Sequence, residues 1–71
     1  MSKVKERASR DLFSVSLDLD IILFKLKNIK DDLEEGGLVE QLKDLDSIIS
    51  KTKDLQSRTS AVIRSWDNAK D

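Results

Sequence analysis

The chain has 71 residues and a formal net charge of −1, because 13 basic residues nearly balance 14 acidic ones. The near-neutral balance argues against a general binder of nucleic acids or of anionic membranes. The absence of cysteine and histidine removes disulfides, thiolate nucleophiles, the commonest general base and the usual zinc ligands. We therefore expect one small domain that is not an enzyme and that holds no cofactor and no metal.

The basic start of the chain does not continue into a targeting or membrane segment. Asp11, Asp18 and Asp20 interrupt the apolar stretch that a signal peptide requires. The longest apolar run, residues 21–24, is far shorter than the roughly 20 residues that cross a bilayer. We expect a cytoplasmic protein that does not insert into membranes.

A heptad pattern predicts a first helix at about residues 8–35. Apolar side chains recur there at alternating spacings of four and three residues, which is typical of a helix packed against another helix. With Leu12 at heptad position a, the pattern predicts a seam at positions a and d. The predicted seam is Leu12, Val15, Leu19, Ile22, Leu26, Ile29 and Leu33.

A break at Gly36 and Gly37 separates the first helix from a second one. Apart from these two glycines, the sequence between residues 4 and 69 contains no glycine or proline. One of the two glycines is expected to adopt the left-handed conformation that ends a helix. The pair is also short enough to join two antiparallel helices.

The second helix is predicted at about residues 38–68, with a weaker seam. Its predicted seam is Leu45, Ile48, Leu55, Val62 and Trp66, together with Thr52 and Thr59. A buried threonine hydroxyl is expected to donate to the carbonyl oxygen four residues earlier. Leu42, Ile49 and Ile63 widen the apolar stripe on one flank.

These elements predict an all-α fold, a coiled-coil-like antiparallel hairpin of two helices that turns at Gly36 and Gly37. Residues 1–71 then form one domain. The end near the turn is expected to pack better than the open end, because Thr52 and Thr59 dilute the apolar seam farther from the turn. Residues 1–7 are expected to fray.

The first helix carries a second apolar stripe on its outer side. The stripe consists of Phe13, Leu17, Ile21 and Phe24, at heptad positions b, f, c and f. A single hairpin covers only one side of this helix, so the outer stripe is predicted to contact a protein. Two occupants remain open, a different protein or further copies of this chain in a homo-oligomer.

The stretch from Leu26 to Leu42, KNIKDDLEEGGLVEQ between those two leucines, resembles the helix–Gly-Gly–helix core of a known family. That family is the small co-chaperones of the type III secretion needle subunit, and the resemblance covers roughly residues 12–65. It implies a hairpin that docks on a larger helical chaperone and helps to keep the needle subunit unpolymerised in the cytoplasm. The outer stripe is our prediction for the docking face, and it comes from the pattern in this sequence.

Two alternatives stand beside a co-chaperone or adaptor. One is a self-assembling coiled-coil protein or filament subunit, in which the outer stripe belongs to the core of an oligomer. The other is a small regulator that binds nucleic acid through its basic start, Lys3, Lys5, Arg7 and Arg10. We rank the three functions in this order.

Overall fold

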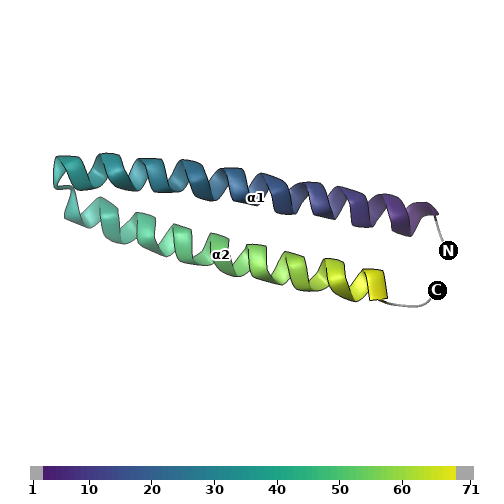
Figure 1. The fold of residues 1–71 in the computed structure, drawn as a ribbon. Coiled ribbons are helices and arrows are strands. Elements are labelled where there is room, and N and C mark those ends of the chain that lie inside the picture. The colour runs from purple at the N-terminus through teal and green to yellow at the C-terminus, as the bar shows by residue number, and fades with distance from the viewer. Residues whose placement is uncertain (1–2, 69–71) are drawn as a thin grey trace.

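The computed structural model describes residues 3–68, and these form two long helices. Helix α1 spans Lys3–Gly36 and helix α2 spans Val39–Asn68. The helices lie side by side and antiparallel, joined at one end of a rod that measures 53 × 15 × 12 Å. Figure 1 shows the start of α1 and the end of α2 at the opposite end of the rod. The predicted all-α hairpin is confirmed.

The turn is closed by the glycine conformation that the sequence predicts. Gly37 has a φ of 66°. The Gly37 amide donates to the Glu34 carbonyl oxygen at 3.1 Å, and the Leu38 amide donates to the Leu33 carbonyl oxygen at 3.0 Å. These two hydrogen bonds form a Schellman motif, which satisfies carbonyls that the end of a helix leaves without partners.

Helix α1 begins earlier than the sequence pattern predicts. Residues 3–7, which we expected to fray, belong to the helix in the structure, while residues 1 and 2 lie outside the described residues. The segment contains no glycine or proline, and Glu6 in the first turn complements the positive end of the helix dipole. Its local composition therefore favours continuing the helix.

The core of the hairpin is small and sits toward the turn. Leu23, Leu45 and Ile49 form a buried cluster, and Leu26 and Leu33 pack against it. No described side chain is completely buried, because two helices alone cannot surround a residue. The prediction of better packing near the turn is confirmed.

The structure corrects half of the predicted seam. Five of the six side chains predicted at heptad position d are 43–52% exposed: Val15, Ile22, Ile29, Ile48 and Leu55. Their places in the seam are taken by residues at heptad position e, among them Leu23 and Ile49. Both helices are therefore rotated by about 50° about their own axes from the predicted register, since successive residues are about 100° apart.

The other half of the seam agrees with the prediction. Within the two helices, the residues at position a are buried or half-buried up to Thr59, and they include Leu12, Leu19, Leu26, Leu33 and Leu45. Trp66, at position a near the open end, is 37% exposed, and Val62 is the one predicted position-d residue that is half-buried. Position a is thus shared by the predicted and observed registers.

The two threonines of the seam use the predicted hydrogen bond. The Thr52 and Thr59 hydroxyls donate to the carbonyl oxygens of Ile48 and Leu55, each at 2.8 Å. Among the described residues, no buried side-chain polar atom lacks a hydrogen-bond partner. The polar middle of α2 is therefore compatible with a packed seam.

Candidate functional site

The outer stripe lies on α1, turned away from the seam. Its four side chains are exposed by half or more of their surface: Phe13 54%, Leu17 50%, Ile21 55% and Phe24 66%. They span about three turns of one unbroken helix, so the backbone holds them in fixed relative positions. The outer stripe is available to a binding partner without any change in the hairpin.

A second apolar surface is present that sequence reasoning missed. It is made by the five exposed side chains that the predicted register placed inside the hairpin, and we call it the aliphatic face. Its members are Val15, Ile22 and Ile29 on α1 and Ile48 and Leu55 on α2. One signal in the sequence could have revealed it. Leu42, Ile49 and Ile63 are apolar residues at heptad position e, so positions e and d of α2 are both suited to the seam.

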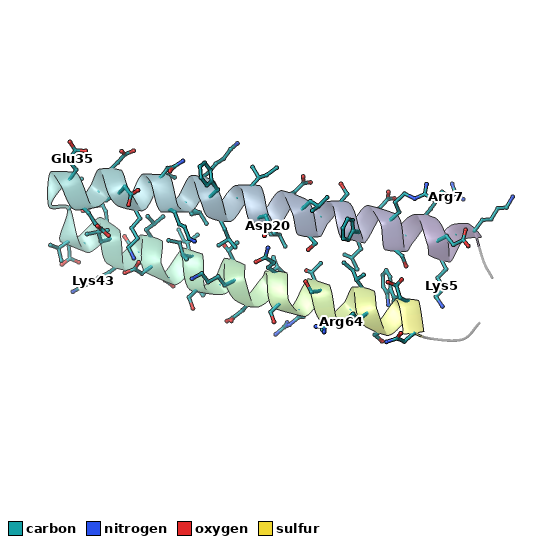
Figure 2. The ribbon with its side chains drawn as sticks, in the orientation of Figure 1. Lys5, Arg7, Asp20, Glu35, Lys43 and Arg64 are labelled. Carbon is teal, nitrogen blue, oxygen red and sulfur yellow. The ribbon has the colours of Figure 1, made fainter. Side chains whose placement is uncertain are left out.

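Two polar contacts between the helices lie on the side of the hairpin opposite to the aliphatic face. The Gln56 side-chain amide donates a hydrogen bond to the Asp20 carboxylate, and the Lys30 ammonium lies 3.2 Å from the Asp46 carboxylate. Figure 2 shows Asp20 on the side of α1 that faces α2. Both contacts join a heptad b position to a heptad e position, so the b flanks of the two helices share one side.

The aliphatic face is consequently continuous across both helices. Position d lies on the flank of each helix opposite to position b, and in an antiparallel pair equivalent flanks fall on the same side. The three residues on α1 and the two on α2 therefore form one surface that spans the seam. Phe24 of the outer stripe lies about 160° around α1 from Ile22, at about 100° per residue, so the two surfaces face different directions.

The basic start of the chain is only partly a free surface. Lys3, Arg7 and Arg10 are exposed, whereas Lys5 is half-buried and has an interaction partner. Figure 2 shows Lys5 pointing to the α2 side of α1 and Arg7 pointing away from it. Because Lys5 belongs to the side that packs, the four basic residues do not form one stripe.

The described residues contain no group of three or more acidic side chains placed to hold a metal ion. Neither described helix combines the length and the apolar character that crossing a membrane requires. What the arrangement offers is apolar area on two sides of a rigid rod. Such area binds other apolar protein surfaces.

Comparisons with known proteins add no relative: no family model, curated protein or solved structure matches this chain.

Proposed function

We propose that this chain is a non-catalytic, protein-binding hairpin that uses its outer stripe to cover an apolar surface of a larger helical protein. The single observation behind the proposal is the exposure of Phe13, Leu17, Ile21 and Phe24 on one long helix. None of the four belongs to the buried cluster of the hairpin. Their exposed apolar area is thus not used by the core of a single hairpin.

The binding mode would be a helix laid into an apolar groove, in which side chains about one turn apart act as anchors. Burying each of the four side chains is worth about 1.5–3 kcal/mol before the costs of association are subtracted. Two of the four are phenylalanines, and aromatic side chains bury more area than aliphatic ones. The outer stripe therefore has enough apolar surface for a specific complex.

The resemblance of residues 26–42 to the needle-subunit co-chaperones suggests a more specific role. In that role the hairpin docks on a larger helical chaperone in the cytoplasm, and the pair keeps a type III secretion needle subunit from polymerising. A rigid hairpin with an exposed stripe on its first helix is compatible with this role. The role itself stays a proposal that rests on the resemblance.

The test is to purify the tagged chain from its native cells and to measure the mass of the complex by size-exclusion chromatography with light scattering. Mass spectrometry then identifies the bound proteins. The proposal expects a stoichiometric helical chaperone together with a small helical secretion subunit. Bound proteins of another kind, or no second protein, would remove the co-chaperone role.

Matched variants connect the complex to the outer stripe. Phe24→Asp should abolish the complex and leave the helical circular dichroism signal unchanged. Val4→Asp is the control, because Val4 is also 66% exposed but lies outside the stripe. Leu26→Asp should instead unfold the hairpin, since it places an unpaired charge against the core cluster. Equal loss of the complex in the Phe24 and Val4 variants would contradict the assignment.

A further inference from the structure

The hairpin exposes more surface than a compact protein of its mass. Its accessible surface is 5619 Å², whereas a compact monomer of 8.1 kDa exposes about 4,500 Å². The excess of about 1,100 Å² is larger than the roughly 800 Å² that each partner buries in a standard stable interface. One hairpin therefore exposes enough surface beyond that of a compact monomer for a complete interface.

The aliphatic face is the side best built for a further layer of helices. It spans both helices, and its five members are all aliphatic (Val15, Ile22, Ile29, Ile48 and Leu55). Such half-exposed positions beside a seam become core positions when two hairpins stack into a four-helix bundle. The outer stripe, by contrast, lies on α1 alone.

We propose that the aliphatic face joins two copies of this chain into a four-helix bundle in which the hairpins run antiparallel. The two-fold axis passes near Ile22 of α1 and near Lys51 of α2. The Asp20–Gln56 and Lys30–Asp46 contacts place Asp54 level with Ile22, so Lys51 lies three residues, or about 4.5 Å, from that level. The axis passes between the levels of Ile22 and Lys51, and the aliphatic side chains of the two copies meet across it with a stagger of less than one helical turn.

The charges beside the aliphatic face favour this arrangement. The exposed g positions that border it are Asp11, Asp18, Lys25 and Asp32 on α1 and Asp44, Lys51 and Arg58 on α2. Antiparallel stacking brings Asp18 near Lys25 of the second copy and Asp44 near Arg58 of the second copy. By symmetry each of these opposite-charge pairs forms twice. Two like-charge pairs oppose them. Asp11 lies near Asp32 of the second copy, which also happens twice, and Lys51 lies near Lys51 of the second copy, which happens once.

Parallel stacking matches the charges less well. It places α1 of one copy over α2 of the other at the same level, which brings Lys25 near Lys51 and Asp32 near Asp44. Both are like-charge pairs that form twice, against one opposite-charge pair, Asp18 with Arg58, which also forms twice. Since like charges at an interface disfavour an orientation, the antiparallel bundle is the better match.

This dimer does not depend on the proposed function. It uses the aliphatic face and leaves the outer stripe open on the outside of the bundle. A second copy and a larger helical partner are therefore compatible with each other. Failure of the dimer would not affect the outer stripe, and failure of the complex with a chaperone would not affect the dimer.

Sedimentation equilibrium of the purified full chain tests the proposal. The expected result is a concentration-dependent mass that reaches twice 8.1 kDa. Ile22→Glu should raise the dissociation constant by at least about 100-fold, because symmetry places two carboxylates at the axis. Phe24→Glu is the control and should leave the mass unchanged. A monomer at every concentration, or a dimer lost only with Phe24→Glu, would overturn the proposal.

Three further variants test the orientation without touching the seam. Lys25→Asp should weaken the antiparallel dimer by about five-fold, because it puts like charges together at two places. In the parallel arrangement the same substitution would strengthen the dimer. The chain has no cysteine, so Ile22→Cys introduces a unique thiol that should form a disulfide between copies on oxidation. Phe24→Cys should not, and a strengthened Lys25→Asp dimer or equal cross-linking of both cysteines would contradict the bundle.

Discussion

The Leu38 amide donates a hydrogen bond to the Leu33 carbonyl oxygen at 3.0 Å, and this contact closes the turn between the two helices. It forms only because Gly37, between them, adopts a φ of 66°. Leu38 also begins the next helix, since its own carbonyl oxygen accepts the Leu42 amide at 3.0 Å. The Leu38 amide therefore bonds to the end of α1 and the Leu38 carbonyl oxygen to the start of α2, which keeps the connection between the helices short.

The two glycines of the turn should respond oppositely to alanine. Gly37→Ala should destabilise the hairpin by about 1–2 kcal/mol, because an L-residue is strained at positive φ. Gly36→Ala should be neutral or stabilising by up to about 1 kcal/mol, because a Cβ there meets only Leu38 at 3.6 Å and glycine is a poor helix former. Urea unfolding followed by circular dichroism measures both. Equal destabilisation would contradict this account of the turn.

Neighbouring isoleucines on α2 test the corrected register. Ile49 is 8% exposed, so Ile49→Ala should lower the free energy of unfolding of the hairpin by about 2–4 kcal/mol. Ile48→Ala should cost less than about 1 kcal/mol in the monomer, since Ile48 is 49% exposed. Unfolding at a protein concentration where the chain is monomeric separates this effect from the proposed dimer. A larger loss at Ile48 than at Ile49 would restore the predicted seam.

Thr59 is a polar residue in an apolar position. Thr59→Val should stabilise the hairpin by up to about 1 kcal/mol, because the buried hydroxyl binds only a carbonyl of its own helix. Thr59→Ser is the matched control. It keeps the hydroxyl, loses a buried methyl group and should cost about 0.8 kcal/mol. Thermal unfolding checks both, and a lower melting temperature for Thr59→Val would show that the hydroxyl is needed.

The ion pair between Lys30 and Asp46 should contribute little to stability. Its side chains are 39% and 58% exposed, so solvent screens the attraction. A double-mutant cycle with Lys30→Ala and Asp46→Ala should give a coupling of about 0.2–1 kcal/mol. The coupling should fall further in about 1 M NaCl, where the Debye length is near 3 Å. A coupling that persists in high salt would contradict a screened surface pair.

The outer stripe is an example of a feature that sequence reasoning identified by elimination. Phe13, Leu17, Ile21 and Phe24 fall outside any seam through Leu12 and Leu19, so they are exposed in either register. The aliphatic face was not predictable in the same way. Ile22 and Leu23 are adjacent and similarly hydrophobic, and nothing local says which of them faces the second helix.

Local features of the sequence are enough to predict the two helices, the turn at Gly36 and Gly37 and the seam residues at heptad position a. Periodicity, helix-forming composition and the conformational freedom of glycine act locally, so these features do not depend on a partner helix. The choice between positions d and e for the second half of the seam is made by the packing of the two helices against each other. That choice is a rotation of about 50° about each helix axis, and it depends on both helices at once. Leu23 and Ile49 are buried together, and this packing leaves Ile22 and Ile48 on the surface.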